Sequence, residues 1–283
     1  MRLDTKVVEL YPEFSRSFVG KLCDEKKILV NGKPEKAGYQ VKENDKVTLA
    51  IDVEALKTVP KINMPILFED DDVIVINKPA GILTHSKGTF NPEATVASFI
   101  ADRVNFPTTN EPNTRAGIVH RLDRATSGVI ICAKHAQALS WLQKQFSARK
   151  AKKTYIAIID GMLEPKEAII DMPIARNPKN PKTFYVSPNG KPAQTHYRII
   201  DSDEKYCTIL LQPTTGRTHQ LRVHLAYLGH PIVGDTLYKG ETNDRMLLHA
   251  QKLEIRLPSG DRKEFIAQIP EDFHTYNNEY GAV

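Results

Sequence analysis

The sequence lacks the features that mark several classes of protein. Its three cysteines, Cys23, Cys132 and Cys207, lie far apart and form no C-x-x-C motif, so neither a disulfide framework nor a structural zinc site is expected. No apolar run approaches the ~20 residues that a membrane helix needs, and the first residues contain no signal-peptide core. We therefore expect a cytoplasmic protein with reduced thiols.

The composition is otherwise ordinary. The chain has 283 residues, of which 41% are hydrophobic and 26% are charged, as in a soluble globular protein with two domains or one large domain. The formal net charge is +5. This mild excess of positive charge is compatible with a polyanionic partner but does not by itself establish one.

One stretch, residues 120–128, organises the rest of the chain. It precedes the short apolar run 129–133, which predicts a buried strand, so Asp123 is expected in a tight connection just before that strand. Ser127 and Gly128 are expected to supply the turn. Two neighbouring arginines would keep Asp123 ionised, as a nucleophile must be, although each of these residues alone is also ordinary turn chemistry.

The nine-residue string as a whole, H-R-L-D-R-A-T-S-G, resembles the signature H-R-L-D-x-x-T-S-G of the RluA family of pseudouridine synthases. The resemblance implies that Asp123 is the catalytic aspartate. It also implies that His120 and Arg121 contact the substrate, with Arg121 helping to hold the RNA open. A kinase catalytic loop has H-R-D without the leucine, and no glycine-rich phosphate loop or D-F-G accompanies the string here.

Residues 1–51 predict a small separate module. Ser15 is expected to cap a short helix with an apolar face. Residues 28–33 predict a strand that enters an Asn-Gly hairpin turn, and residues 39–41 and 46–50 predict two further short β segments. The module is therefore expected to be a small α/β unit.

Three short strings in this module, R-L-D, S-R-S and V-N-G-K, are similar to the RNA-binding module named after ribosomal protein S-four. The resemblance implies basic groups that contact RNA phosphates, which give affinity with little sequence information. The candidates are Arg2, Arg16, Lys21 and Lys33. The alternative is a solvated charged face on an accessory domain.

Residues 52–64 show no clear period and predict a linker, and residues 65–283 predict the second domain. The run from Glu69 to Gly81 resembles E-D-x-x-V-x-V-x-N-K-P-A-G, which opens the catalytic domain of the same family, and its Lys78 is expected to be architectural. Residues 92–105 predict a helix with proline at its start.

Residues 137–149 predict an amphipathic helix that runs into the basic cluster 149–153. The next segment, 154–161, predicts a strand and resembles the family's K-x-Y-x-A strand. The resemblance implies that Tyr155 is catalytic, and we expect Lys153 to contact the RNA. A solvated helix end that complements the helix dipole is the alternative for the cluster.

Residues 171–194 are rich in proline, asparagine and lysine and predict a long basic loop or hairpin arm. The family usually has an arginine- and methionine-bearing segment here, and this sequence departs from it because residues 182–184 are Lys-Thr-Phe. Residues 195–200 and 206–211 then predict two paired strands, and residues 247–269 predict two more.

In the stretch that begins at residue 213, Leu221, Leu225 and Leu228 recur at helical spacing and predict a helix that ends at Gly229. The stretch resembles the family motif G-R-T-H-Q-x-R-V-H, followed by G-H-P-I-x-G-D. The resemblance implies that Arg222 pairs with the catalytic aspartate, that Arg217 is a second positive group and that Leu225 walls the uracil site. The two histidines of the motif are five residues apart, which does not give the two-ligand face of H-E-x-x-H, so no metal is predicted.

The family resemblance implies isomerisation of uridine to pseudouridine in RNA. In this reaction Asp123 is the ionised carboxylate that attacks. Arg222 is the cation that keeps its charge and orients Asp123, and Tyr155 is the weak acid or base that helps with the final proton. No cofactor or metal is expected. The sequence does not decide whether Asp123 attacks the sugar or the base.

The same resemblance implies an α+β fold with a mixed, largely antiparallel central sheet and flanking helices. RNA is the expected partner, without a membrane, and a monomer is expected by default. Large-subunit ribosomal RNA is favoured because family members with such an N-terminal module often modify it, while transfer RNA stays open. Two other classes compete: a non-catalytic RNA-binding assembly factor, and a hydrolase that uses Asp123 with His120.

Overall fold

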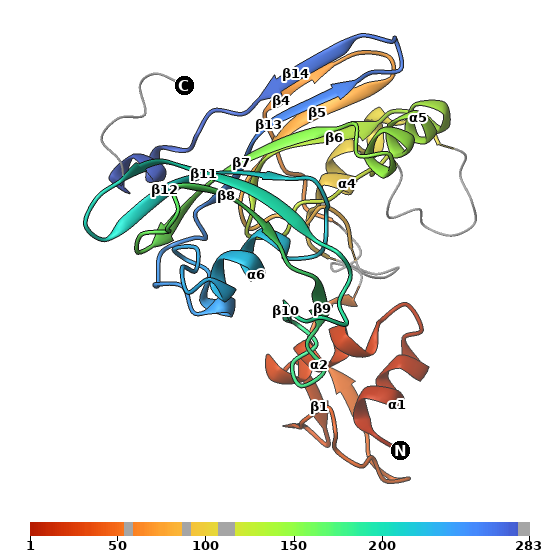
Figure 1. Cartoon of the computed structure of the whole chain (residues 1–283). Coiled ribbons are helices and arrows are strands. Elements are labelled where there is room, and N and C mark those ends of the chain that lie inside the picture. The colour runs from red at the N-terminus through yellow and green to blue at the C-terminus, as the bar shows by residue number, and fades with distance from the viewer. Residues whose placement is uncertain (54–58, 87–91, 107–116, 277–283) are drawn as a thin grey trace. The chain divides into compact units, whose positions relative to one another are not determined.

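The structure is a computed structural model that describes residues 1–53, 59–86, 92–106 and 117–276 (Figure 1). These residues form two compact units. The first contains residues 1–53, 59–62, 85–86 and 92–99, and the second contains residues 63–84, 100–106 and 117–276. The division into module, linker and second domain at residues 51 and 64 stays a prediction, and residues 54–58 lie outside the described residues. The sequence did not suggest that residues 92–99 would group with the first unit.

The first unit packs two helices on a small sheet. Ser15 caps the second helix, as predicted, by accepting a hydrogen bond from the backbone N–H of Phe18. Asn31 and Gly32 both have positive φ, which fits the predicted Asn-Gly hairpin turn. The three strands pair antiparallel in the order β2-β1-β3. The elements are α1 (Leu3–Leu10), α2 (Arg16–Asp24), β1 (Ile28–Val30), β2 (Lys33–Pro34) and β3 (Val47–Leu49).

Two predictions for this unit were wrong in part. Residues 39–41 form no strand and contribute only one isolated bridge, between Arg2 and Gln40. The helix predicted over 92–105 is shorter, because Thr95 and Ser98 cap it by exchanging bonds between side chains and backbone N–H groups. Helix α4 (Val96–Ile100) therefore starts after the proline and continues as one 3-10 turn, η1 (Ala101–Arg103).

The second unit is built on one nine-stranded sheet. Its order is β4-β5-β6-β13-β7-β12-β11-β8, with β14 paired to β13, and all pairs are antiparallel except β6 with β13. This confirms the predicted mixed, largely antiparallel sheet. The strands are β4 (Ile66–Glu69), β5 (Val73–Lys78), β6 (Ser127–Ala133), β7 (Lys152–Asp160), β8 (Glu167–Asp171), β11 (Gln194–Ser202), β12 (Tyr206–Pro213), β13 (Leu248–Arg256) and β14 (Arg262–Ile266).

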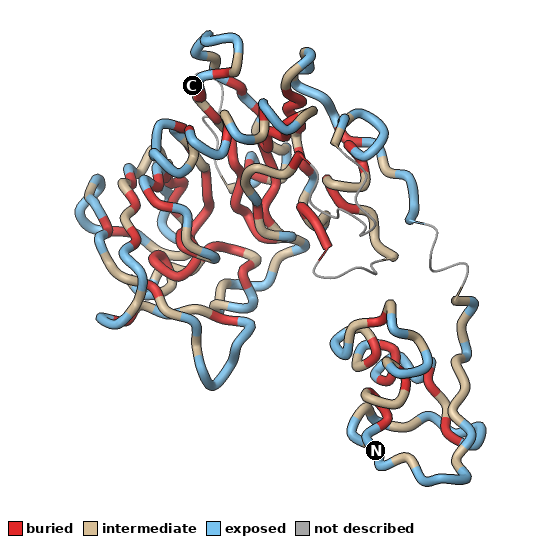
Figure 2. Tube along the Cα trace, turned by 90° about the vertical axis from the view of Figure 1, so that its right-hand side faces the viewer, coloured by how far each residue is buried: buried red, intermediate tan, exposed pale blue. Residues whose placement is uncertain are grey.

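Each half of the sheet has its own apolar core, and the buried residues follow the strands (Figure 2). Helix α5 (Ala136–Ser147) buries Leu142 against the half that contains β5 and β6. Helix α6 (Gln220–Tyr227) buries Leu225 against the half that contains β7 and β12. None of the helices in the described ranges is long and apolar enough to span a membrane.

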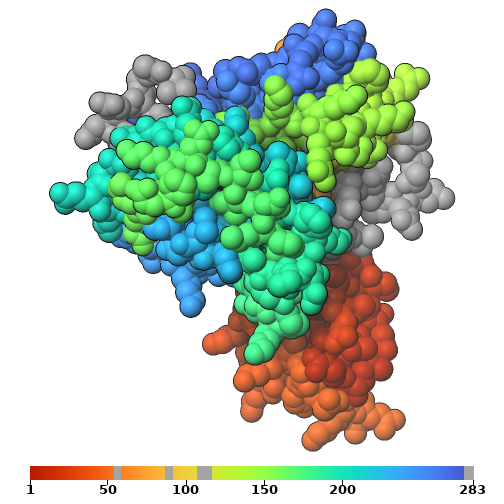
Figure 3. Space-filling model, in the orientation of Figure 1, coloured from red at the N-terminus to blue at the C-terminus, as the bar shows by residue number. Residues whose placement is uncertain are grey.

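The predicted basic arm is a hairpin. Strands β9 (Ile174–Arg176) and β10 (Phe184–Val186) pair antiparallel in a sheet of their own. The arm projects from the large sheet, as Figures 1 and 3 show. Two short 3-10 turns complete the unit, η2 (Thr236–Tyr238) and η3 (Glu271–Tyr276).

The start of β6 differs from the prediction. Ser127 and Gly128 are the first two residues of the strand, and the turn lies earlier, where the N–H of Thr126 bonds the carbonyl of Asp123 at 3.1 Å. Gly128 has a φ of 115° and pairs with Ala250 of β13. A Cβ at this position would lie 2.2 Å from the Ala250 carbonyl oxygen. Glycine is therefore required by close strand approach as well as by backbone conformation.

We expect Gly128→Ala to lower the free energy of unfolding far more than Gly229→Ala. Gly229 also has a positive φ but has no atom within 4 Å of its Cβ position, so its substitution adds only backbone strain. Gly128→Ala adds a steric clash, which costs about 1–3 kcal/mol or more beyond the strain. Urea unfolding of both variants measures the difference, and equal losses would contradict the close-approach argument.

Candidate active site

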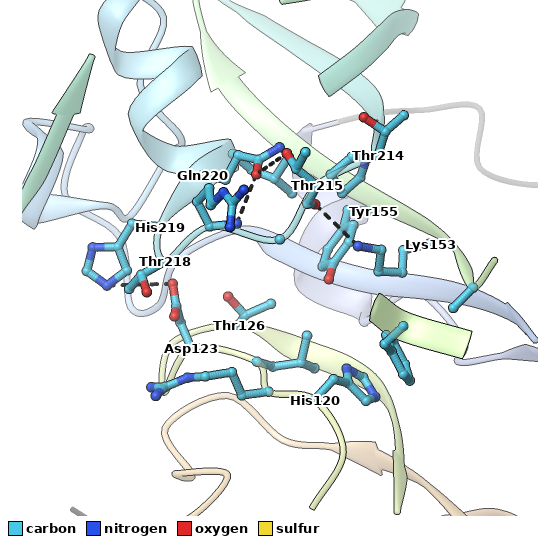
Figure 4. A pocket seen from close by; sticks show the side chains of 18 of the residues that line it. His120, Asp123, Thr126, Lys153, Tyr155, Thr214, Thr215, Thr218, His219 and Gln220 are labelled. Carbon is cyan, nitrogen blue, oxygen red and sulfur yellow. Dashed lines mark hydrogen bonds and ion pairs between the residues drawn. The ribbon is translucent and has the colours of Figure 1, made fainter. Parts of the chain in front are cut away.

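A cavity of about 600 Å³ opens in the second unit beside the β6 loop (Figure 4). Its walls come from the loop before β6, the end of α5, the start of β7 and the turn that leads into α6. The lining includes Asp123, Tyr155 and Arg222, which are far apart in the sequence. The three residues expected to be catalytic are thus brought to one cavity.

Buried hydrogen bonds fix the loop that carries Asp123. Thr84 Oγ1 donates to the Leu122 carbonyl at 2.9 Å and accepts from the Leu122 N–H at 3.2 Å. The Lys78 Nζ donates to the carbonyls of Pro79, Ile82 and Arg124 at 2.7, 2.8 and 3.3 Å. These contacts hold the backbone on both sides of Asp123.

Lys78 is fully buried, which fits the architectural role expected for it. Burial lowers the pKa of its ammonium to about 7. Three carbonyl acceptors nevertheless match the three protons of the charged form, and they oppose this effect. Lys78 therefore stabilises the backbone around the loop that carries Asp123.

Arg222 links Asp123 to a second carboxylate. Its Nη1 lies 3.3 Å from Asp123 Oδ2, while Nε and Nη2 bond Asp235 Oδ2 and Oδ1 at 2.7 and 2.8 Å. Burial alone would lower the pKa of the Arg222 guanidinium, but the bonds and charges of the two carboxylates raise it. The guanidinium is thus permanently charged and oriented by Asp235.

Asp235 was not among the predicted residues. It closes the string G-H-P-I-x-G-D that follows the α6 motif, so the sequence did carry a signal for it. Only the fold shows that it is buried against Arg222, with 2% of its side chain exposed.

Tyr155 and Lys153 face the same cavity from β7 (Figure 4). Burial and the charge of Asp123 raise the pKa of the Tyr155 phenol, so its hydroxyl is protonated in the free protein. The Lys153 Nζ donates to the Thr215 carbonyl at 3.3 Å, and burial lowers the pKa of this ammonium.

His219 is a second residue that the sequence interpretation missed. Its Nε2 lies 3.7 Å from Asp123 Oδ2, and its Nδ1 lies 2.8 Å from the Tyr238 hydroxyl. The residue is the N-cap of α6 and has a φ of 58°, a left-handed conformation that is uncommon for a side chain of this kind. In the sequence this histidine stands out only as one of two motif histidines whose spacing does not fit a metal site.

The four expected substrate contacts other than Lys153 have different surroundings. Arg121 is exposed and lines the cavity. His120 also lines it, but its Nε2 accepts from the Ile131 N–H at 3.1 Å and its ring stacks on Phe146. Burial and nearby Lys153 lower the pKa of this imidazole to about 3, so it is neutral. Its contacts are those of a packing residue.

The other two are Arg217 and Leu225. The Nε of Arg217 donates to the Pro192 carbonyl at 3.0 Å at the edge of the cavity. Leu225 departs from the prediction, because helix α6 turns it into the core, where it is fully buried. The apolar residues that line the cavity include Leu221 and Leu248.

The four basic residues expected to bind RNA in the first unit differ in their partners. Arg2 and Arg16 both pair with the buried carboxylate of Asp4, at 3.0 and 2.7 Å. Lys21 lies 3.4 Å from Glu93. Lys33 is exposed and has no ion pair within the described part of the chain. Across the described ranges, no group of three or more His, Cys, Asp or Glu residues could hold a metal ion.

Two family models match the chain. The model described as RNA pseudouridylate synthase matches residues 72–227, and the model described as S4 domain matches residues 1–47. Among curated proteins, the chain is 38% identical over 290 residues to ribosomal large subunit pseudouridine synthase D of Borreliella burgdorferi, covering 96% of this chain and 87% of that protein. The protein of the same name from Escherichia coli strain K12 is 36% identical over 291 residues, covering 96% and 88%.

Solved structures agree with this match. Human RNA pseudouridylate synthase domain containing 1 aligns with a TM-score of 0.61 and 26% identity, covering 81% of this chain and 90% of that one. Human RNA pseudouridylate synthase domain containing 4 gives a TM-score of 0.59 and 25% identity, covering 74% and 89%.

We expect Asp235→Ala to lower the free energy of unfolding by about 3–5 kcal/mol, because it leaves the Arg222 guanidinium buried without its main partner. Adding Arg222→Met to this variant removes the stranded charge and is expected to restore part of the loss. Urea unfolding of the single and double variants measures both effects. A loss below about 1 kcal/mol, as for an exposed ion pair, would contradict the buried-pair argument.

Proposed function

Since this chain belongs to the RNA pseudouridylate synthase family and is an RNA pseudouridine synthase with an RNA-binding S4 domain, we propose that it acts on uridines of large-subunit ribosomal RNA with Asp123 as nucleophile. In this reaction the glycosidic bond to a ring nitrogen breaks and the ribose is rejoined to a ring carbon, which loses its proton. Family membership sets aside the hydrolase and the non-catalytic assembly factor.

The observation that carries the assignment of Asp123 is the contrast between the two carboxylates on Arg222. Asp235 accepts two short bonds from the guanidinium and is almost wholly buried, so it can orient but cannot reach a substrate. Asp123 has one longer contact, keeps 19% of its side chain exposed and lines the cavity. An attack on the sugar and an attack on the base both need such an ionised, accessible oxygen.

Tyr155, on β7, supports the same proposal. Its protonated phenol faces the cavity, where it can hold the uracil ring and later take part in removal of the ring-carbon proton. Arg121, exposed beside Asp123, is suited to fill the space that a base leaves when it is flipped out of the RNA.

The choice of ribosomal RNA is supported by the relatives, which carry that substrate in their names and align over nearly the whole chain. The cytoplasmic location and the monomeric state expected from the sequence stay predictions.

We expect Asp123→Ala to abolish tritium release from RNA labelled at uracil C5, by at least about 10³-fold, while RNA affinity stays within about threefold. The isosteric Asp123→Asn, which keeps the shape and loses the charge, is expected to behave in the same way. Unmodified large-subunit ribosomal RNA, small-subunit ribosomal RNA and transfer RNA serve as separate substrates.

Release from large-subunit ribosomal RNA by the wild type only would support both parts of the proposal. Release from transfer RNA alone would contradict the substrate but not the nucleophile. Release by folded Asp123→Ala would overturn the assignment of Asp123.

In the first unit we expect Lys33→Ala to weaken RNA binding and to reduce the salt slope of the affinity by about one unit, because its exposed ammonium makes no ion pair with the described residues and can bind a phosphate. Arg2→Ala, in contrast, is expected to act mainly on stability, since Arg2 neutralises the buried Asp4. Filter binding at several salt concentrations, with thermal unfolding of both variants, separates the two effects. An unchanged salt slope for Lys33→Ala would contradict a phosphate contact.

A further inference from the structure

One turn of the chain carries two side chains, Asp235 and Tyr238, that bond the residues in contact with Asp123. The N–H of Tyr238 bonds the Asp235 carbonyl at 3.0 Å, which fixes the spacing of the two residues. From this turn, Asp235 holds Arg222 and Tyr238 holds His219. Arg222 and His219 then approach the same oxygen, Oδ2 of Asp123, at 3.3 and 3.7 Å. Figure 4 shows the His219 ring beside Asp123.

The hydrogen bonds of Tyr238 favour one tautomer of His219. The Tyr238 oxygen accepts from the N–H of Phe184 at 2.9 Å, so its own proton is free to go to His219 Nδ1, 2.8 Å away. Burial lowers the pKa of the His219 imidazole, so the ring is neutral. A neutral ring that accepts at Nδ1 carries its proton on Nε2, and this N–H is directed at Asp123.

Aromatic and cation contacts surround this pair. The Tyr238 ring lies over the Arg222 guanidinium, 5.0 Å from its centre, and the His219 ring packs edge-on against both Tyr238 and Phe184. Phe184 belongs to β10, so the backbone of the basic arm contributes to the support of the nucleophile. The 3.7 Å between His219 Nε2 and Asp123 Oδ2 is longer than a hydrogen bond, but such contacts often shorten when the substrate is bound.

We propose that His219 and Tyr238 are positioning residues that form a second support for the nucleophile, alongside Asp235 and Arg222. In the complex with RNA, His219 Nε2 donates to Oδ2 of Asp123, and Oδ1 is the oxygen that attacks. Within the described chain, no hydrogen bond to Oδ1 competes with this role. The inference rests on the proposed role of Asp123 and adds a function for two residues beyond it.

Two substitutions of His219 separate its backbone from its side chain. His219→Asn tolerates the left-handed conformation and can still bond Tyr238, but its amide is too short to reach Asp123. His219→Gln places an N–H donor at the distance of Nε2. His196→Asn, at a surface histidine that pairs with Glu167, is the matched control.

In single-turnover tritium release at saturating RNA, we expect His219→Asn to lower the rate constant by about 10- to 100-fold, with RNA affinity and thermal midpoint close to those of the wild type. His219→Gln is expected to recover about a third of a log unit to one log unit of that loss, since it restores the donor. His196→Asn is expected to match the wild type.

Tyr238→Phe tests whether the two residues act as one unit. It removes the hydroxyl that sets the tautomer, so it is expected to lower the rate constant, and the double variant with His219→Asn is expected to be no slower than His219→Asn alone. Three outcomes would each overturn the inference. They are a double variant in which the two rate losses multiply, a wild-type rate constant for His219→Asn, and equal rate constants for His219→Asn and His219→Gln. Activity in Asp123→Ala would instead overturn the proposed function, so the two failures are distinguishable.

Discussion

The buried guanidinium of Arg222 is the interaction on which the site depends. A charge with so little exposure is stable only when it is paired and its donors are satisfied, and two carboxylates share this task. Because Arg222 is on α6, Asp235 is on the turn before η2 and Asp123 is on the β6 loop, the ion pairs also join three segments. The same contacts that stabilise the second unit therefore fix the distance between Asp123 and Arg222.

The other side of the loop that carries Asp123 is fixed by hydrogen bonds to its backbone. Lys78 and Thr84 bind backbone groups on either side of Asp123, and Gly128 brings β6 against β13. The backbone of Asp123 is therefore held from both sides. Reactions that need one atom placed in a defined position gain from such preorganisation, because the cost of ordering is met during folding and not during the reaction.

The sequence predicted the elements and residues whose signal is local. Strands such as β6 and β7 have continuous apolar runs, and Asp123, Tyr155 and Arg222 lie inside long specific strings. The predictions failed where tertiary contacts decide: Leu225 is turned to the core by the packing of α6, and Gly128 is drawn into a strand by β13. The pairing of His219 with Tyr238 was not predicted, because no local pattern in the sequence connects the two residues and only the fold brings them into contact.

The charge of Asp123 also bears on when Tyr155 could act. In the free protein this charge adds to burial in raising the pKa of the phenol, so Tyr155 is a poor base before the reaction starts. When a carboxylate forms a bond to substrate, it loses its negative charge, and its contribution to the raised pKa disappears. In the proposed reaction, a phenol in this position becomes a better proton acceptor only after Asp123 has formed its bond to the substrate, which is the stage at which the ring carbon must lose its proton. The electrostatics of this pair of side chains thus support that order of steps for the proposed reaction.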